Sequence, residues 1–323
     1  MNLLKDTEYK TLEQLCGLSQ EGVKKVLNHF LHTKYKKVVN TQNYIYAVGD
    51  IPIALVAHMD TVFRFPAQEI YYDRVKNVIW SPQGLGADDR AGIFAILQIV
   101  KKGLRPHIIF TTDEEKGAVG ASELAKEKCP FKDLRYIIQL DRRNSCDCVF
   151  YDCDNMKFVD YIEKFGFVEA IGSFTDISML CPAWGIAGVN LSIGYLDEHS
   201  ISETLHVGHM LNTINKVVNM LQEKKIPTFK YIPMKFQNCN WFQYLYASND
   251  KNSKCKFCHK ELPKEEMIPV KDNSPLGLAY VCIDCISDKV EWCSECGEAF
   301  EVDATQKRTI CEECLYDGYY KPY

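Results

Sequence analysis

The chain has 323 residues, of which 46% are hydrophobic and 25% charged, and this balance is typical of a globular protein with one full-sized domain and a smaller one. A formal net charge of -5 argues against a general polyanion binder. The polar start MNLLKDTEYK argues against a signal peptide, and no run of ~18 apolar residues predicts a membrane span. We therefore expect a cytoplasmic protein.

The fifteen cysteines are unevenly distributed along the chain. Without an export signal they are more typical of metal ligands or free thiols than of a disulfide framework. Eight of them form four CxxC pairs after residue 254, and the other seven show no ligand-like spacing. We predict a large domain over 1–228, an aromatic-rich packing segment and linker over 229–254, and two four-cysteine modules over 255–323.

Short apolar runs alternate with amphipathic segments along 1–228. The runs typical of buried strands are 51–60, 107–115, 134–141 and 188–195. The segments with helical spacing of apolar residues are 90–103, 156–167 and 203–225. This alternation predicts an α/β domain with a mixed, mostly parallel sheet covered on both faces, a fold that binds ligands at the carboxyl ends of its strands.

Metal-binding residue types stand at the predicted ends of the strands and before the helix at 90–103. They are His58 and Asp60, Asp88 and Asp89, Glu114 and Glu115, Asp141, and His199. Taken singly, such residues are more often turn residues, helix caps or solvated surface groups. Because their segments converge on one edge of the sheet, we predict a metal site there. A bound cation would also remove the repulsion between adjacent carboxylates.

Five motifs carry a resemblance to a known family. The motifs are AHMDTV, GADDRAG, TTDEEKGAVG, QLD and GYLDEHSISE, and they span about residues 50–210. In this order they resemble the co-catalytic dinuclear zinc exopeptidases, which include peptidase T-like tripeptidases and zinc aminopeptidases. The resemblance implies a three-layer α/β/α fold and two catalytic Zn²⁺ ions, or Co²⁺ or Mn²⁺.

The same resemblance implies a role for each ligand. His58 and Asp141 would bind one zinc, Glu115 and His199 the other, and Asp88 would bridge them. It also implies a cis peptide between Asp88 and Asp89. These side chains supply the nitrogen and oxygen ligands that zinc prefers.

Two further residues are candidate catalytic groups. Asp60 stands two residues after His58, so in extended chain both side chains project to the same side, and Asp60 can accept the second imidazole N–H. Glu114 and Glu115 are adjacent and point apart, so one can bind metal while the other acts as general base on a bridging hydroxide. We assign the base to Glu114. Ser200 and Glu203 match the capping box of a helix that follows His199.

The chain also departs from many members of this family. Fewer than sixty residues separate Asp141 from His199, which leaves no room for a lid domain and resembles the lid-free aminopeptidases. Ile171 stands where peptidase T-like relatives place an arginine before the substrate loop. In that loop, Thr175 and Asp176 either line the site or simply cap a helix.

The CxxC pairs predict two structural zinc sites, because four thiolates complete a tetrahedral zinc site. The cysteines are Cys255, Cys258, Cys282, Cys285, Cys293, Cys296, Cys311 and Cys314. Sequential pairing, as in two zinc ribbons, is favoured over a cross-braced arrangement. Residues 251–323 hold ten Lys and Arg against fourteen Asp and Glu. This balance argues against a nucleic-acid partner and favours a protein partner for the tail.

The sequence thus predicts a dinuclear zinc metallopeptidase that cleaves small peptides or removes amino-terminal residues. Two alternatives remain open. The same residues could remove the acyl group from N-acyl amino acids. The chain could also be a non-catalytic interaction protein that uses its zinc-ribbon tail.

Overall fold

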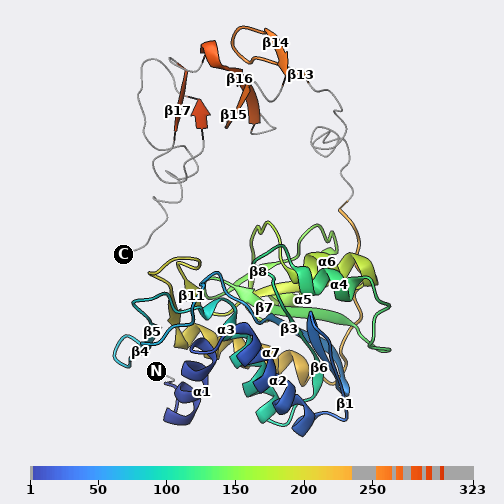
Figure 1. Cartoon of the computed structure of the whole chain (residues 1–323). Coiled ribbons are helices and arrows are strands. Elements are labelled where there is room, and N and C mark those ends of the chain that lie inside the picture. Colours follow the sequence, from blue (N-terminus) through green and yellow to red (C-terminus); the bar gives the residue numbers. More distant parts are fainter. Residues whose placement is uncertain are drawn as a thin grey trace. The chain divides into compact units, whose positions relative to one another are not determined.

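The computed structural model describes residues 3–234, 252–263, 267–271, 278–285, 289–292 and 299–301 (Figure 1). It divides the chain into two compact units, Met1–Lys235 and Phe236–Tyr323. Residues 235–251 of the predicted packing segment and linker lie outside the described residues, as do Cys293, Cys296, Cys311 and Cys314. Among the helices that are described, none is both long and apolar enough to cross a membrane.

The first unit is built on an eight-stranded sheet with the order β1-β2-β6-β3-β7-β10-β8-β9. Its strands are β1 (Lys37–Asn40), β2 (Tyr44–Val48), β3 (Ile51–His58), β6 (Pro106–Thr111), β7 (Tyr136–Arg142), β8 (Asp147–Val149), β9 (Val168–Glu169) and β10 (Gly188–Ser192). The four central strands, β6, β3, β7 and β10, are parallel, whereas the β1–β2 hairpin and β8 add antiparallel pairs. The prediction of a mixed, mostly parallel sheet is confirmed.

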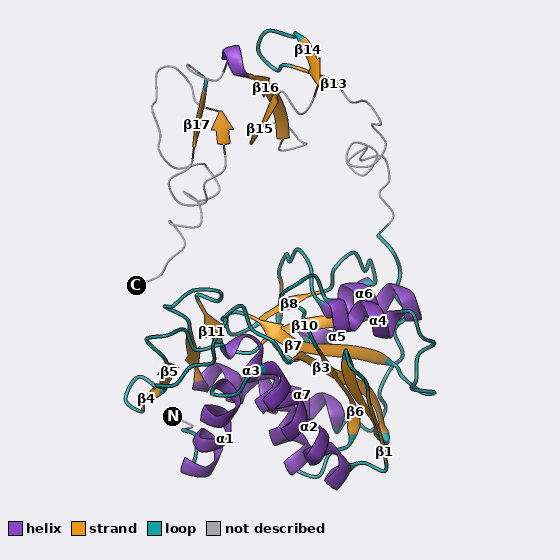
Figure 2. Ribbon diagram, in the orientation of Figure 1, coloured by secondary structure: helices purple, strands orange, loops and turns teal. Residues whose placement is uncertain are grey.

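Helices cover both faces of this sheet (Figure 2). They are α1 (Asp6–Cys16), α2 (Gln20–Lys34), α3 (Ala87–Lys101), α4 (Val119–Ala125), α5 (Met156–Glu163), α6 (Asp176–Trp184) and α7 (Val207–Leu221). Side chains alternate along β3, so that Leu55 packs in the core with α1, α2, α3, α5 and α7, and Val56 packs in the core with α4 and α6. The result is the predicted three-layer arrangement.

The long helix expected at 203–225 is shorter than predicted. Residues Thr204–His206 form strand β12, and α7 begins at Val207. The short strand belongs to a second sheet, β11-β12-β5-β4, in which Leu205 pairs with Ile79. Its other strands are β4 (Tyr71–Asp73), β5 (Val78–Trp80) and β11 (Tyr195–Leu196). Pairing with a distant strand therefore decides the structure of this segment.

Residues 226–234, the last described part of the first unit, pack on the rest of it. Phe229 is buried, and its ring centroid lies 4.8 Å from that of Phe158. Lys230 forms an isolated bridge with Ile186, and Pro233 forms one with Cys153. These contacts fix the end of the described part of the first unit.

The second unit consists of short strands around a small core. A hairpin joins β13 (Asn252–Lys254) to β14 (Glu261–Pro263), and a sheet has the order β16-β15-β18-β17. Its strands are β15 (Met267–Lys271), β16 (Leu278–Cys282), β17 (Val290–Trp292) and β18 (Ala299–Glu301). Cys255 and Cys282 belong to the small buried core.

Candidate metal centre

One half of the centre lies where two parallel strands end side by side. His58 is the last residue of β3, and Asp141 lies near the end of the neighbouring β7. The His58 Nε2 atom is 3.0 Å from Asp88 Oδ1 and 3.4 Å from Asp141 Oδ1. All three side chains are buried, so the structure brings these predicted ligands together at the expected edge.

The other half faces the second oxygen of Asp88. His199 Nε2 is 3.2 Å from Asp88 Oδ2 and 3.1 Å from Glu115 Oε1. His199 follows β11 and has a positive φ of 63°, a conformation that only a minority of non-glycine residues adopt. The two oxygens of Asp88 therefore face two separate pairs, each made of one imidazole and one carboxylate.

Asp60 supports both halves. Its Oδ1 lies 3.3 Å from His58 Nδ1, the ring nitrogen that faces away from Asp88. The same carboxylate accepts the backbone N–H groups of Glu114, at 3.0 Å, and Glu115, at 3.1 Å. Although burial opposes it, these hydrogen bonds and the charge of His58 lower the pKa of Asp60 to about 2. Asp60 therefore contacts the ring nitrogen of His58 on the side opposite Asp88, where a group that orients a metal ligand would lie.

Crowding of acids raises the pKa of several groups in the cluster. Burial raises the pKa of Glu114 to about 9, and the negative charges of Asp141 and Asp176 add to the effect. Burial and Asp141 likewise raise the pKa of Asp88 to about 6. Hydrogen bonds to Asp88 and Glu115 raise the pKa of His199 to about 11. Such mutual repulsion is what a bound dication would offset.

Asp141 is held by three neighbours that the sequence analysis did not single out as its partners. Its Oδ2 accepts hydrogen bonds from Thr175 Oγ1, at 2.9 Å, and Gln139 Nε2, at 3.0 Å, while its Oδ1 accepts one from Tyr195, at 3.1 Å. Thr175 is also the N-cap residue of α6. That it lines a substrate site stays a prediction. Asp176 is fully buried and accepts the hydroxyl of Thr111 at 2.5 Å.

The predicted capping box at Ser200 and Glu203 is wrong. The Ser200 hydroxyl donates to the Asp197 carbonyl, and α7 begins only at Val207. Glu203 instead turns its carboxylate toward the segment before α3, where it accepts the backbone N–H of Gly86 at 2.5 Å and that of Asp88 at 3.0 Å. The motif S-x-x-E gives no signal for such a contact, because it joins segments more than a hundred residues apart.

The donor set fits a pair of zinc ions. His58, Asp88 and Asp141 offer ligand atoms that all lie within 4.8 Å of one another, and so do Asp88, Glu115 and His199. Glu115 Oε1 is buried and faces His199 Nε2 at 3.1 Å. Two imidazoles and three carboxylates match the nitrogen and oxygen ligands of catalytic zinc sites. The peptide between Asp88 and Asp89 is cis, as the family resemblance implied.

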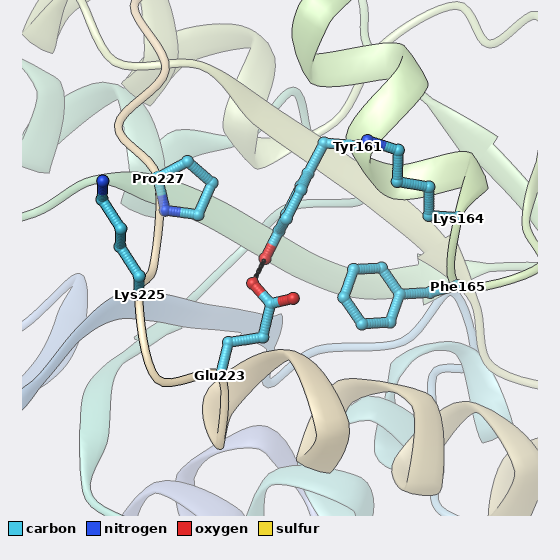
Figure 3. Close-up of a pocket in the computed structure, with 6 residues that line it drawn as sticks. All are labelled: Tyr161, Lys164, Phe165, Glu223, Lys225 and Pro227. Atoms are coloured by element: carbon cyan, nitrogen blue, oxygen red, sulfur yellow. Dashed lines mark hydrogen bonds between the residues drawn. The ribbon is translucent and has the colours of Figure 1, made fainter.

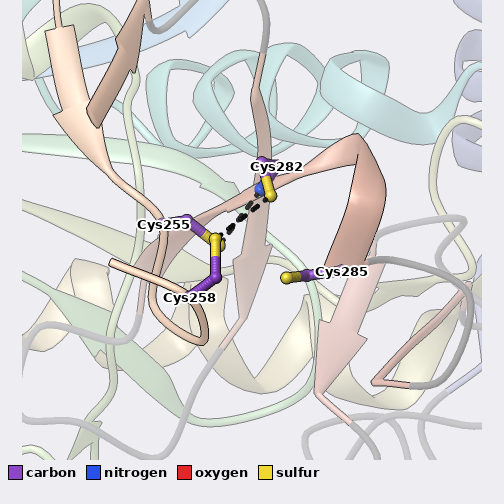
Figure 4. A group of neighbouring side chains, drawn as sticks. All are labelled: Cys255, Cys258, Cys282 and Cys285. Carbon is purple, nitrogen blue, oxygen red and sulfur yellow. Dashed lines mark hydrogen bonds between the residues drawn. The ribbon is translucent and has the colours of Figure 1, made fainter. Parts of the chain in front are cut away.

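A second cluster lies in the second unit, where four cysteines meet (Figure 4). Cys255 and Cys258 lie in the loop between β13 and β14, and Cys282 and Cys285 lie at and after the end of β16. Their sulfur atoms lie within 4.8 Å of one another, and Cys258 Sγ is 3.6 Å from Cys282 Sγ. Although burial opposes it, nearby backbone N–H groups lower the pKa of Cys255 to about 6, which favours the thiolate. The first two CxxC pairs are thus juxtaposed, as sequential pairing requires.

A cavity of about 490 Å³ lies elsewhere on the first unit (Figure 3). Its lining residues are Tyr161, Lys164, Phe165, Glu223, Lys225 and Pro227. The Tyr161 hydroxyl donates to Glu223 at 2.8 Å across it. None of the candidate metal ligands lines this cavity, and we assign no function to it. A smaller cavity, of about 290 Å³, includes Asp60 in its wall.

Comparison with known proteins supports a peptidase-related first unit. Residues 39–151 match the family model described as Peptidase family M28. This range contains all the candidate ligands except His199. No curated protein matches the chain.

Solved structures show the same fold. Aminopeptidase PepT from Bacillus cereus ATCC 10987 is 14% identical, with a TM-score of 0.52, over 67% of this chain and 97% of that one. A tripeptidase from Staphylococcus aureus subsp. aureus Mu50 is 14% identical, with a TM-score of 0.53, over 68% and 99%. A TET aminopeptidase from a marine sediment Thaumarchaeota archaeon is 13% identical, with a TM-score of 0.51, over 68% and 97%. These likenesses confirm the predicted fold class.

Proposed function

We propose that this protein is a metal-dependent, aminopeptidase-like peptide hydrolase. One observation carries the proposal: the two oxygens of Asp88 face two separate imidazole–carboxylate pairs, at 3.0 Å from His58 Nε2 and 3.2 Å from His199 Nε2. A carboxylate shared in this way is what two metal ions about 3.5–4 Å apart require. The similarity of residues 39–151 to Peptidase family M28 supports the same reading.

The roles of the ligands follow from their neighbours. His58 and Asp141 would hold one ion, Glu115 and His199 the other, and Asp88 both. Zinc ions bound there, or cobalt or manganese ions, would polarise the peptide carbonyl and lower the pKa of a water molecule. Thr175, Gln139 and Tyr195 fix the orientation of Asp141 before any ion binds.

Glu114 is the general base of this proposal. It neighbours Glu115 in the chain, its backbone N–H donates to Asp60, and its carboxyl group is near enough to the cluster for the charges of His58 and Asp141 to shift its pKa. Burial and the negative charges of Asp141 and Asp176 raise its pKa, and two bound cations would offset those charges and leave the carboxylate free to accept a proton. It would take the proton of the attacking water and deliver it to the leaving amine.

The substrates of this proposal are small peptides or the amino-terminal residues of longer ones. No long insertion separates Asp141 from His199, so we propose a site without a lid domain. The four cysteines Cys255, Cys258, Cys282 and Cys285 would hold a structural zinc, because thiolates would fill all of its positions. We propose the same role for the remaining two CxxC pairs, and a protein partner for the tail.

The test is the substitution Glu114→Gln. We expect the variant to keep its metal and lose peptide hydrolysis by about 10²- to 10⁴-fold, because it removes the proton carrier and no ligand. Metal content and the turnover of a panel of dipeptides, tripeptides and N-acyl amino acids would be measured on the same preparation. Glu123→Gln, which removes a surface carboxylate paired with Lys126, is the control. Undiminished turnover by Glu114→Gln would refute the mechanism, and activity on acyl amino acids alone would refute the substrate class.

A further inference from the structure

The exposed ligand of the proposed centre is His199. Its side chain is 52% exposed, whereas those of His58, Asp88 and Asp141 are at most 10% exposed. Packing in the core therefore contributes little to the position of its imidazole. The backbone there is in the left-handed region, and Asp197, two residues earlier, also has a positive φ of 55°. Something other than burial must hold this loop in register with the rest of the site.

The loop is closed by its own hydrogen bonds. The Ser200 hydroxyl donates to the Asp197 carbonyl at 2.8 Å, and the Ser202 N–H donates to Ser200 Oγ at 3.1 Å. The Glu203 N–H donates to the Ser200 carbonyl at 3.1 Å. His199 and Glu203 are therefore parts of one tight turn, and a displacement of one is transmitted to the other.

Glu203 links this turn to the segment that carries the shared carboxylate. It is 1% exposed, and its two oxygens accept separate backbone N–H groups, Oε2 that of Gly86 at 2.5 Å and Oε1 that of Asp88 at 3.0 Å. Two bonds from one rigid carboxylate to two points of one segment restrict both translation and rotation of that segment. The contact thus joins the backbone of Asp88 to the turn of His199.

We propose that Glu203 is a positioning residue that sets the spacing between the two halves of the metal centre. Its carboxylate accepts backbone N–H groups, and no hydrogen bond joins it to a candidate ligand side chain among the described residues. It would bind neither ion nor substrate. It fixes the backbone of Asp88, which faces both halves, relative to His199, which belongs to one. This inference rests on the proposed function, because it presumes that the two halves bind metal.

The expected effect is a loss of metal affinity. Partners that orient metal ligands without touching the ion typically contribute about 10- to 100-fold in affinity. In Glu203→Gln, the amide oxygen can still accept one backbone N–H, but the amide NH₂ would meet the other. We expect the ion held by Glu115 and His199 to bind about 10- to 100-fold more weakly, with a smaller loss for the ion held by His58 and Asp141.

The experiment is a zinc titration of the full-length chain against a competing chelator, with zinc content measured by mass spectrometry. Glu203→Gln and Glu203→Asp would be compared with wild type, since a shorter carboxylate can restore part of the contact. Glu198→Gln is the matched control: it lies in the same loop, but its carboxylate faces Arg143 at 3.3 Å. The cysteine sites contribute equally to all four proteins and cancel. Circular dichroism would establish that each variant is folded.

Three outcomes are distinguishable without any activity measurement. Weaker binding of one ion in Glu203→Gln, with partial recovery in Glu203→Asp and wild-type binding in Glu198→Gln, supports the proposal. Wild-type zinc binding by a folded Glu203→Gln overturns it while leaving the proposed function intact. If wild type binds no zinc beyond the cysteine sites, the proposed function itself fails. If Glu203→Gln does not fold, the same comparison is made with Glu203→Asp, for which unchanged binding also overturns the proposal.

Discussion

His107 is a buried imidazole at the amino end of β6, the end opposite the candidate metal centre. Its Nδ1 accepts the backbone N–H of Gly49 at 3.1 Å, and its ring stacks on Phe131 with centroids 4.3 Å apart. Burial lowers its pKa from 6.5 to about 4. The folded protein therefore keeps this side chain neutral at a pH where the unfolded chain binds a proton.

Because the pKa of His107 is lower in the folded than in the unfolded chain, the free energy of unfolding falls as the pH is lowered. The contribution of His107 to stability is complete above pH 6.5 and is lost as the pH falls from 6.5 toward about 4. We expect His107→Asn, whose amide oxygen can replace Nδ1 as acceptor, to reduce the loss of unfolding free energy between about pH 7.5 and about pH 5 by roughly 2 kcal/mol. Urea unfolding of both metal-free proteins at each pH measures this. An equal loss in the two proteins would contradict the assignment.

At the scale of single residues, the sequence predicted which side chains meet but not what holds them. His58, Asp88, Glu115, Asp141 and His199 could be located because they stand at segment ends that a parallel sheet brings to one edge. Their supporting contacts are the bonds from Thr175 and Tyr195 to Asp141 and from Glu203 to the Asp88 backbone. These depend on the tertiary packing of distant segments, which no local pattern encodes.

Among the elements, α3 approaches the sheet closely at Gly92. A methyl group added at Gly92 would lie 2.1 Å from the carbonyl oxygen of Leu140 in β7 and 2.3 Å from Asp89 Oδ1. Neither group can move freely. The Leu140 carbonyl belongs to the sheet backbone, and the Asp89 carboxylate accepts the N–H of Gly92 at Oδ1 and that of His58 at Oδ2. The helix that follows the candidate ligand Asp88 can therefore lie against β7 only if this position is glycine.

Gly92→Ala should accordingly destabilise the fold by about 3 kcal/mol or more, since the clash is with fixed backbone. Gly22 in α2 is the control, because an added methyl would meet a flexible leucine side chain at 3.2 Å. Gly22→Ala should be neutral or stabilise by up to about 1 kcal/mol through helix propensity. Chemical denaturation would measure the free energy of unfolding of both variants and of wild type. Equal stabilities would show that α3 can shift away from the sheet.

Element boundaries show where sequence patterns stop being informative. Apolar runs located β3, β6 and β7 because buried parallel strands are continuous in apolar residues. The helix predicted from residue 203 begins at Val207, because Thr204–His206 pairs with β5 instead. A three-residue strand has too few side chains for a period to be visible, and its partner lies more than a hundred residues away.

For the whole molecule, the two units carry separate candidate metal sites. The imidazole–carboxylate ligands all belong to Met1–Lys235, and the four described cysteines all belong to Phe236–Tyr323. The second unit has a small described core that includes Cys255 and Cys282 themselves. A unit of this kind depends on its metal for folding more than one with a large core.

Cys282→Ser in the full-length chain should therefore lose about one zinc equivalent and destabilise the second unit, while the metal of the first unit and peptide hydrolysis are unchanged. His58→Ala should do the reverse, with loss of hydrolysis and an intact cysteine site. Zinc content and peptide turnover of both variants would be measured. Loss of hydrolysis in Cys282→Ser would show that the two units depend on each other.

A separate cysteine-rich part of the chain could be anticipated, because CxxC spacing is local and visible in the sequence. The proposed limits of the linker at 229 and 254 remain a prediction, since residues 235–251 lie outside the described residues. How the remaining CxxC pairs combine also remains a prediction. Spacing restricts the possible partners, but only the packing of the strands selects among them.

The Asp60 carboxylate accepts the two adjacent backbone N–H groups of Glu114 and Glu115. The same carboxylate contacts His58 at Nδ1. In the proposed reaction, one side chain, Asp60, thus positions both the general base Glu114 and the metal ligand Glu115. A change at Asp60 would therefore displace the proposed base and a proposed metal ligand together.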